Sequence, residues 1–305
     1  MPIVEKDPWR LQYFKGVSCP AEVVIPTDDM LAYQLYPDHN WTYNKLLICK
    51  TQGLEHGPHG LVPVKFPIFS KPIYNLRGMG TGSRIINNPD ELESHYLPGH
   101  FWMPFFEGEH VSSDVAVING EPVWWRHTTG KPLGDGTFDY WTVLAEPQPN
   151  VEAYCGQWIQ SNLSGYTGIV NLETISGQII ECHLRLSDQW VDLNGPNWIE
   201  SVVELYTHKQ WNFTDDSRKT GYSVVLFTEH GQQYKRIDSG TINELLKKPH
   251  ISSIQITFHQ DKPPEVHAMP PGGFRLAIVN CWDLNAGFEL REILVSLFGV
   301  KLKRI

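Results

Sequence analysis

The sequence has little of what marks several common classes of protein. It carries 25 basic residues against 34 acidic ones, a formal net charge of -9, and the basic residues are scattered. Nucleic-acid binding needs a concentrated Lys/Arg surface, so no nucleic-acid partner is expected. No run approaches 18 apolar residues, and the first ten residues carry charges and a proline where a signal peptide would be apolar. We therefore expect a soluble, cytoplasmic chain with no membrane partner.

Cysteine is also scarce, and its spacing excludes two kinds of site. The five cysteines are odd in number, far apart and free of any Cys-x-x-Cys pair, so neither a disulfide framework nor a zinc knuckle is indicated. Buried thiols are expected instead. The chain also lacks a Walker A sequence, the Rossmann glycine spacing and the Gly-x-Ser-x-Gly turn of a hydrolase.

What the sequence does contain is typical of a globular, loop-rich protein. It has 305 residues, 41% of them hydrophobic and 19% charged, with 25 glycines and 22 prolines. Three regions differ in pattern: a short lead-in at 1–44, a main region at 45–206 where apolar strands alternate with turns, and a smaller β-rich lobe at 207–305. The expected class is α+β.

Strands are expected where short apolar runs lie between turn residues, at 64–70, 84–86, 112–118, 123–127, 167–175, 179–186, 222–228, 253–258 and 275–280. Helices are expected at 89–96, 197–206 and 285–297. For the first of these, Asn88 is the predicted N-cap and Pro89 the first helical residue.

A lysine followed by a glycine-rich loop forms the first candidate site. The apolar stretch 66–72 contains Lys71 near its end, and Gly78, Gly80 and Gly82 follow it. Glycines let backbone N–H groups approach anionic oxygens closely, and a lysine on the preceding strand supplies a point charge for phosphate. The alternative is a structural glycine turn beside a surface lysine.

A polar hairpin forms the second candidate site. Two consecutive predicted strands meet at a three-residue loop, residues 176–178. A loop of odd length pairs Glu173 with Glu181 and Asn171 with His183. Alternation then places an apolar stripe on the opposite face, which we expect to be core: Val170, Leu172, Ile180, Cys182 and Leu184.

The paired acids point to a cation. Directly opposed carboxylates about 5 Å apart repel each other unless a proton or a cation lies between them. Hard oxygen ligands on a rigid sheet suit Mg²⁺, which completes its shell with phosphate and water. The alternative is an exposed polar face on which Arg185 relieves the repulsion.

The order of these features resembles the ATP-grasp superfamily, particularly its carboxylase and carbamoyl-phosphate-synthase-like branch. The lysine-ending strand and the glycine loop are followed by an acidic segment at 107–114 and by paired strands that end in Glu181-Cys-His183-Leu-Arg185. The resemblance spans about residues 45–206, with a weaker match at 273–297. It implies an ATP-grasp fold, in which two α+β lobes clasp ATP and the C-terminal lobe completes the cleft.

The resemblance implies a role for each matching residue. Lys71 and Arg185 would act in catalysis, and Glu173, Glu181 and His183 would hold the metal. The residues that would bind ATP are Lys45, Lys71, Gly78, Gly80, Gly82, Ser83, Met103, Phe105, Phe106, Glu107 and His110. Met103 to Phe106 would form the hinge that contacts adenine, and the ribose contact would fall to Glu107, Glu109 or His110. The implied cofactors are ATP and Mg²⁺.

Three departures from the family pattern matter. The hinge lacks the acidic residue that the family usually has, with Pro104 and Phe105 in that neighbourhood. The family usually has Glu-x-Asn-x-Arg, whereas this chain has His183 in place of the asparagine, and imidazole binds Mg²⁺ poorly compared with an oxygen ligand. The N-terminal domain that normally helps to hold the acceptor is nearly absent. Its task passes to residues 1–44, to the C-terminal lobe or to a partner, either another subunit or a second copy in a homodimer.

The function that these features indicate is that of a Mg-ATP-dependent ligase. A small-molecule carboxylate would be activated as an acyl phosphate and then attacked by an amine or another nucleophile. Two alternatives stay open. One is an ATP-grasp-like protein that binds nucleotide with impaired catalysis, and the other is a small-molecule kinase that uses the same site.

Overall fold

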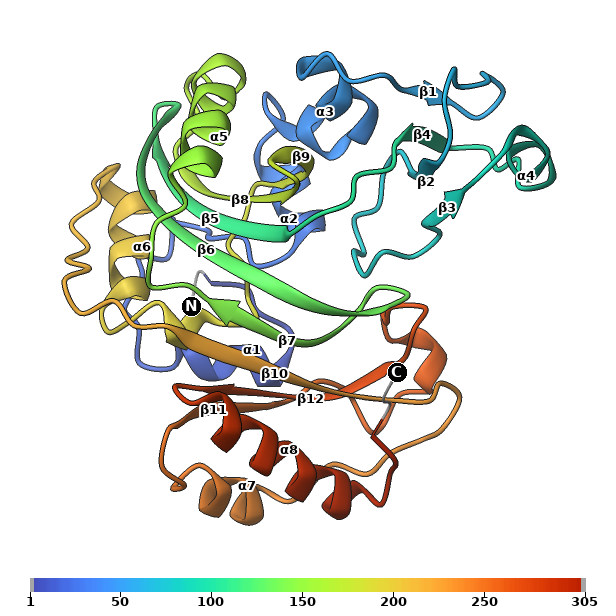
Figure 1. Ribbon diagram of the computed structural model, residues 1–305. Helices are drawn as coiled ribbons and strands as arrows, with labels where there is room; N and C mark the ends of the chain where they lie inside the picture. The colour runs from blue at the N-terminus through green and yellow to red at the C-terminus, as the bar shows by residue number, and fades with distance from the viewer. Residues whose placement is uncertain (1–2, 303–305) are drawn as a thin grey trace. The chain divides into compact units, whose positions relative to one another are not determined.

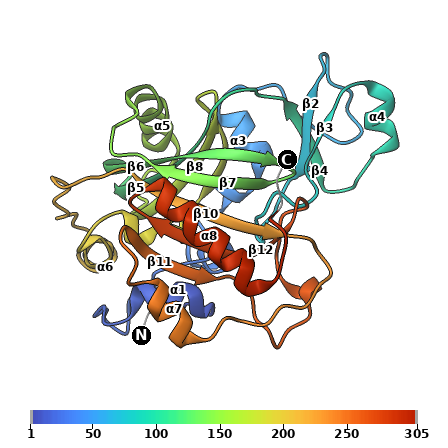
Figure 2. The ribbon, with the colours of Figure 1, turned by 60° about the horizontal axis from the view of Figure 1, so that its bottom comes forward.

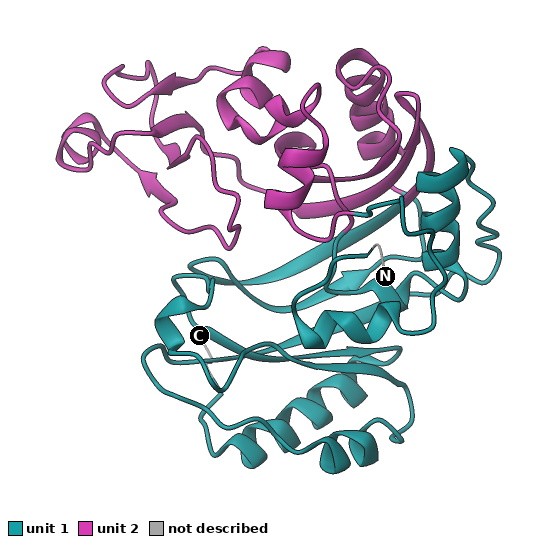
Figure 3. Cartoon of the chain, turned by 180° about the vertical axis from the view of Figure 1, so that it is seen from behind, with its two compact units in different colours: residues 1–25, 126–147, 187–305 teal, residues 26–125, 148–186 magenta. Residues whose placement is uncertain are grey.

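A computed structural model describes residues 3–302. The chain forms two compact units, each built from separate stretches of sequence (Figure 3). Unit 1 comprises Met1–Ile25, Arg126–Pro147 and Ser187–Ile305, and unit 2 comprises Pro26–Trp125 and Gln148–Leu186. Within residues 3–302 no helix is long and apolar enough to cross a membrane. The domain limits expected at residues 45 and 206 come from changes in the sequence pattern and not from compactness. They stay a prediction.

Unit 1 is an antiparallel sheet with a helical layer. Its strands lie in the order β11-β12-β10-β7, and β6 continues the sheet beside β7. The long helix α8 runs across β10 and β12 (Figures 1 and 2), where Leu290 and Leu294 enter a core with Val224 and Val279. Its elements are α1 (Pro8–Leu11), η1 (Gln12–Phe14), β7 (Thr137–Val143), η3 (Val191–Leu193), α6 (Trp198–His208), β10 (Gly221–Thr228), α7 (Ser239–Leu245), β11 (Ile251–Ile256), η4 (Pro264–Val266), β12 (Phe274–Cys281) and α8 (Leu284–Phe298).

Unit 2 contains a small sheet and three strands of a larger one. The small sheet has the order β1-β4-β2-β3, and β5, β8 and β9 lie side by side in antiparallel pairs. Strand β6 (Glu121–Gly134) begins in unit 2 and continues into unit 1. The other elements are α2 (Asp29–Leu35), η2 (Asn40–Tyr43), α3 (Lys45–Thr51), β1 (Gly57–Pro58), β2 (Ile68–Pro72), β3 (Arg84–Ile86), α4 (Pro89–Ser94), β4 (His100–Pro104), β5 (His110–Ile118), α5 (Pro149–Asn162), β8 (Gly168–Ile175) and β9 (Gln178–His183).

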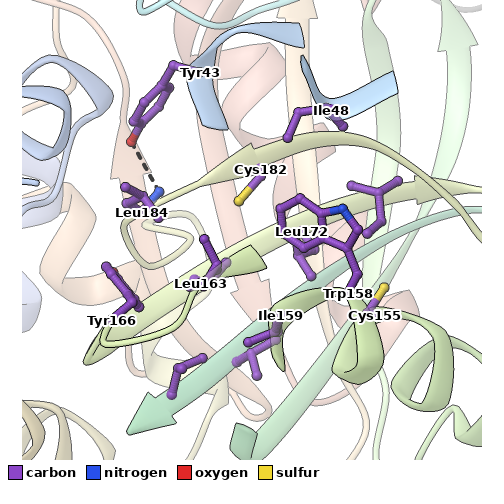
Figure 4. Close-up of a cluster of buried hydrophobic side chains, with 14 of the residues drawn as sticks. Tyr43, Ile48, Cys155, Trp158, Ile159, Leu163, Tyr166, Leu172, Cys182 and Leu184 are labelled. Carbon is purple, nitrogen blue, oxygen red and sulfur yellow. Dashed lines mark hydrogen bonds between the residues drawn. The ribbon is translucent and has the colours of Figure 1, made fainter. Parts of the chain in front are cut away.

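The core of unit 2 lies on one face of β8 and β9 (Figure 4). Leu172, Cys182 and Leu184 are almost wholly buried there, with Trp158 and Ile159 of α5 packed against them. The expected apolar stripe is therefore confirmed at these positions. Burying this face fixes the other face of the hairpin, because adjacent residues of a strand point to opposite sides.

One member of the expected stripe was wrong, and the reason is a bulge. The turn has two residues, Ser176 and Gly177, both with positive φ, instead of the expected three. The register then shifts between Glu173 and Thr174, which leaves Ile180 as an extra residue on β9. Ile179 enters the core in its place, and Ile180 packs with a second cluster. The bulge restores the expected pairing beyond it.

Candidate functional site

The polar face of the β8–β9 hairpin brings the two predicted acids together. Glu173 pairs with Glu181, and Asn171 pairs with His183. The predicted register is confirmed at both pairs. Because the opposite face is core, all four side chains lie on the face that carries no apolar stripe.

Two lysines from different elements converge on Glu181. Lys45 is the first residue of α3, whose N-cap Asn44 accepts a hydrogen bond from Leu46 N–H. Its Nζ lies 3.6 Å from Glu181 Oε2, and Lys71 Nζ, at the end of β2, lies 3.6 Å from Glu181 Oε1. Both lysines are buried. Burial lowers the pKa of Lys71, and the Glu181 carboxylate opposes that shift.

The imidazole of His183 lies between the two acids. Its Nε2 is 3.6 Å from Glu173 Oε1 and 3.5 Å from Glu181 Oε2, and its Nδ1 is 3.1 Å from Asp29 Oδ1. Burial by itself lowers the pKa of His183, but the Asp29 carboxylate outweighs burial and raises the pKa to about 9. The ring is therefore a cation at neutral pH, with a carboxylate oxygen within 3.6 Å of each of its nitrogens.

Asp29, at the start of α2, holds Arg185 as well as His183. Arg185 Nε lies 2.9 Å from Asp29 Oδ1, and Arg185 Nη2 donates to Asp29 Oδ2 at 3.2 Å. Asp29 is 5% exposed and also accepts a hydrogen bond of 3.4 Å from the Tyr43 hydroxyl. Burial by itself raises the pKa of Asp29, but Arg185 and His183 lower it far below its ordinary value. The carboxylate is therefore ionised and fixes two cationic side chains.

Glu173 has a second imidazole on its other side. His110 Nε2, at the start of β5, lies 3.0 Å from Glu173 Oε2. Burial raises the pKa of Glu173, but the two neighbouring histidines lower it well below its ordinary value. His110, expected at the ribose, thus contacts an acid of the site.

The neighbouring position on the same face is a hydrogen-bonded group. The Asn171 amide donates to the Ser112 hydroxyl at 2.9 Å and to the Asp114 carboxylate at 3.0 Å. All three side chains are buried. In the strand pairing, Asn171 lies opposite His183 and Ser112 lies opposite Glu173, so this group is next to the acids.

The glycine loop has the backbone that its sequence predicts. Gly78, Gly80 and Gly82 have φ of 68°, 62° and 80°, and the Asn75 amide donates to the Gly78 carbonyl at 2.8 Å. These angles favour glycine because a side chain is strained there. The loop joins β2 to β3, so it directly follows Lys71 and ends at Ser83. Its role at phosphate stays a prediction.

The residues predicted for adenine binding lie at the end of β4. Met103 is 1% exposed, and its sulfur lies 4.0 Å from Cys49 Sγ. Phe105 and Phe106 follow the strand and are partly buried, and Glu107 is exposed. Phe106 packs in the same cluster as Met103 and Ile180, which precedes Glu181. The hinge residues Met103 and Phe106 therefore pack in the same cluster as the residue before Glu181.

The comparisons with known proteins bear on the fold. No protein-family profile and no curated protein matches the sequence. Among solved structures, an L-amino acid ligase from Bacillus licheniformis matches with a TM-score of 0.59 at 13% identity, over 87% of this chain and 73% of that one. A phosphoribosylamine–glycine ligase from Thermotoga maritima matches with 0.58 at 15% identity, over 84% and 77%. A biotin carboxylase from Campylobacter jejuni matches with 0.58 at 12% identity, over 92% and 75%.

These three proteins share the ATP-grasp fold. This chain has the ATP-grasp fold. The expected α+β class and the resemblance stated from the order of motifs are confirmed at the level of the fold. At identities of 12–15%, these similarities show a shared fold and do not show a shared reaction.

Within this ATP-grasp fold, one group of the predicted site residues is connected by ion pairs, directly or through Asp29. The other predicted residues are located by the strand or loop on which they lie. The group consists of Lys45, Lys71, His110, Glu173, Glu181, His183 and Arg185. The glycine loop and the residues after β4 lie in the adjoining small sheet of unit 2 and the segment that leaves it.

The predicted metal site does not fit this arrangement. Mg²⁺ takes oxygen ligands at about 2.0–2.1 Å, yet each carboxylate oxygen of Glu173 and Glu181 already faces a nitrogen at 3.6 Å or less. The Nε2 of His183, predicted as a ligand, lies 3.5 Å from Glu181 and 3.6 Å from Glu173, in the space that a metal ion shared by the two acids would need. Among residues 3–302 no group of three or more His, Cys, Asp and Glu side chains is arranged to hold a metal ion.

Asp29 is the site residue that sequence reasoning missed. It follows Asp28, whose side chain caps α2 by accepting a hydrogen bond from Leu31 N–H. Two acids at the start of a helix are the ordinary signature of capping. The contacts of Asp29 with His183 and Arg185 join positions more than 150 apart in sequence, so no local pattern announces them.

Proposed function

We propose that this chain binds ATP and uses it to activate a carboxylate for attack by an amine or another nucleophile. The observation that carries the proposal is the convergence of Lys45 and Lys71 on one acidic position inside an ATP-grasp fold. Buried ammonium groups on two elements are a pre-arranged charge for a triphosphate, and such preorganisation is the main source of catalysis in phosphoryl transfer.

The roles within the proposal follow the order of elements. Lys45 and Lys71 would meet the phosphates, and the loop from Gly78 to Ser83 would close over them through backbone N–H groups. Met103, Phe105 and Phe106 would contact adenine, with Glu107 and His110 at the ribose. Two biotin carboxylase structures of this fold were solved with nucleotide, one as a β,γ-ATP complex and one with Mg-ADP.

The proposed reaction has two balanced steps. An oxygen of the substrate carboxylate attacks the γ-phosphorus, the bond to the β-phosphate oxygen breaks, and ADP leaves with that electron pair. The nucleophile then attacks the acyl carbon and loses a proton, and inorganic phosphate leaves. Cationic side chains offset the charge that spreads over the transferred group. In this proposal Mg²⁺ enters only as the counter-ion that ATP carries in solution.

Product analysis tests the proposal and separates its alternatives. The chain would be incubated with ATP, a set of small carboxylic acids and a set of amines, with ADP measured by a coupled assay and products by mass spectrometry. A ligase forms ADP only when both substrates are present and yields a new amide. A kinase leaves phosphate on the acceptor instead.

The third outcome is binding without turnover. Arg185, the predicted catalytic arginine, is already held by two contacts to Asp29, and this favours nucleotide binding with impaired catalysis as the second candidate. In that case ATP would raise the melting temperature, because a ligand that binds only the folded state stabilises it by about 2.7 kcal/mol at a hundredfold excess over Kd. No shift with ATP would refute both candidates.

A further inference from the structure

The structure differs from the predicted site in the cation that lies between the two acids. The two opposed acids of the hairpin need a cation between them. From the sequence that cation was expected to be Mg²⁺, with His183 as one of its ligands. In the structure the space between the acids holds a nitrogen of the chain itself.

We infer that His183 takes the place of a divalent ion between Glu173 and Glu181, so that this chain meets a nucleotide's terminal phosphates with its own side-chain cations. The inference deepens the proposed function and rests on it only for the nucleotide. The exclusion of a metal by His183 is a property of the chain alone.

Each oxygen of the acid pair has a nitrogen of the chain within 3.6 Å. Glu181 Oε1 faces Lys71, and Glu181 Oε2 faces both Lys45 and His183. Glu173 Oε1 faces His183, and Glu173 Oε2 faces His110. A divalent ion shared by the two acids would have to displace the imidazole nitrogen of His183, which lies between them.

His183 is also held from behind, which keeps its ring between the acids. Its Nδ1 contacts Asp29 at 3.1 Å, and Asp29 is buried on α2. The two ring nitrogens thus face three carboxylates on three elements. If the ring swung away to admit a metal, Asp29 would lose one of its two cationic partners inside the protein, which is costly.

An asparagine at this position would behave differently. The substitution His183→Asn removes both the nitrogen between the acids and its positive charge. It offers instead an amide oxygen, a ligand that Mg²⁺ and Mn²⁺ accept. The two carboxylates would then repel each other and favour a cation from solution.

The test is a Mn²⁺ titration without nucleotide, followed by the electron paramagnetic resonance signal of free Mn²⁺. We expect no stoichiometric site in the wild-type chain. We expect His183→Asn to gain one Mn²⁺ site at least about tenfold tighter than any wild-type binding, and His183→Asn with Glu181→Gln to lose that site. His183→Lys, which keeps a positive charge, is the matched control and should gain none.

Two results would overturn the inference. One is a wild-type Mn²⁺ site that disappears in Glu181→Gln, and the other is a folded His183→Asn variant that gains no site. The first arm needs only the wild-type chain and a single variant, so it holds even where His183→Asn fails to fold.

A second measurement separates this inference from the proposed function. ATP affinity of the wild-type chain is measured by calorimetry in EDTA and in excess Mg²⁺. Affinities within about threefold of each other support the inference, whereas binding that requires Mg²⁺ contradicts it. If ATP binds under neither condition, the proposed function fails while the Mn²⁺ result still decides the role of His183.

Discussion

Charged groups from several elements surround His183. Asp29 lies on α2, Glu173 on β8, Glu181 on its own strand β9, and Arg185 two residues further along. Tyr43 of η2 lies with its ring 6.3 Å from the imidazole. The acids outweigh both burial and Arg185, and they keep the ring protonated.

A pH dependence of stability follows from this enclosure. The pKa of His183 rises from its ordinary 6.5 to about 9 on folding. A raised pKa contributes stability that is fully present below pH 6.5 and is lost as pH rises towards 9, by roughly 3 kcal/mol at most. Urea unfolding at several pH values should show this loss in the wild type and not in His183→Asn. The surface pair His208 and Glu204 offers the control, since His208→Asn should leave the profile unchanged.

Asp29 is the residue whose loss should be felt most. It is buried and neutralises two cations, so Asp29→Asn leaves His183 and Arg185 short of a partner. Breaking a buried ion pair by removing one partner costs about 3–5 kcal/mol. We expect the urea midpoint to fall accordingly. Asp38 is exposed on the turn after α2, and Asp38→Asn should change stability by about 0.5 kcal/mol or less. Equal effects of the two substitutions would contradict the role given to Asp29.

At the scale of elements, the β8–β9 hairpin carries both the core and the site. One face is buried against α5 (Figure 4), and the other carries the two acids. A slip of one residue in the pairing would exchange these faces. The buried stripe therefore fixes the position of the charged residues as well as the stability of the unit.

Truncation within that stripe should be severe. Leu172 is wholly buried between β8 and α5, so Leu172→Ala loses apolar contacts and leaves a cavity. The expected cost is about 2–5 kcal/mol. Leu61 is 58% exposed, and the identical substitution there should cost about 0.5 kcal/mol or less. Guanidinium unfolding of the two variants compares them directly. A small loss in Leu172→Ala would mean that this face is not the core.

The hairpin also shows how far sequence reasoning reached. Alternation predicted which residues face the core and paired Glu173 with Glu181, because a two-residue period follows from strand geometry. The bulge at Ile180 was not foreseen, since a bulge depends on how the turn and the pairing beyond it fit together. The helix at Pro89–Ser94 was predicted from its cap, and Asn88 does accept a hydrogen bond from Glu91 N–H.

Helix α5 was not predicted from the sequence, for a different reason. The apolar residues of helix α5 follow a weak helical period and are interrupted by a glycine, and packing in the same core as β8 supplies the stability that the pattern lacks. The site was predicted in part. Glu173 and Glu181 could be paired from strand alternation, but the contacts of Asp29 and the position of the His183 ring depend on tertiary packing.

At the scale of the whole molecule, we assign the phosphates of ATP to cations of unit 2. Lys45 and Lys71 come from a helix and from the small sheet, and both approach the hairpin acids. The phosphates of bound ATP would partly replace Glu181 as the negatively charged partner of these lysines. Affinity should therefore depend on the number of phosphates and on each lysine.

The most direct test is a calorimetric titration of ATP and of AMP, both in EDTA, into the wild type and into Lys71→Met. Methionine keeps the length of the side chain and removes the charge. We expect one ATP site in the wild type, with AMP at least about tenfold weaker and ATP at least about tenfold weaker in Lys71→Met, since a charge-assisted hydrogen bond contributes about 1.5–3 kcal/mol. Equal affinities for ATP and AMP, or an unchanged ATP affinity in a folded Lys71→Met variant, would contradict the assignment of the phosphates to these lysines.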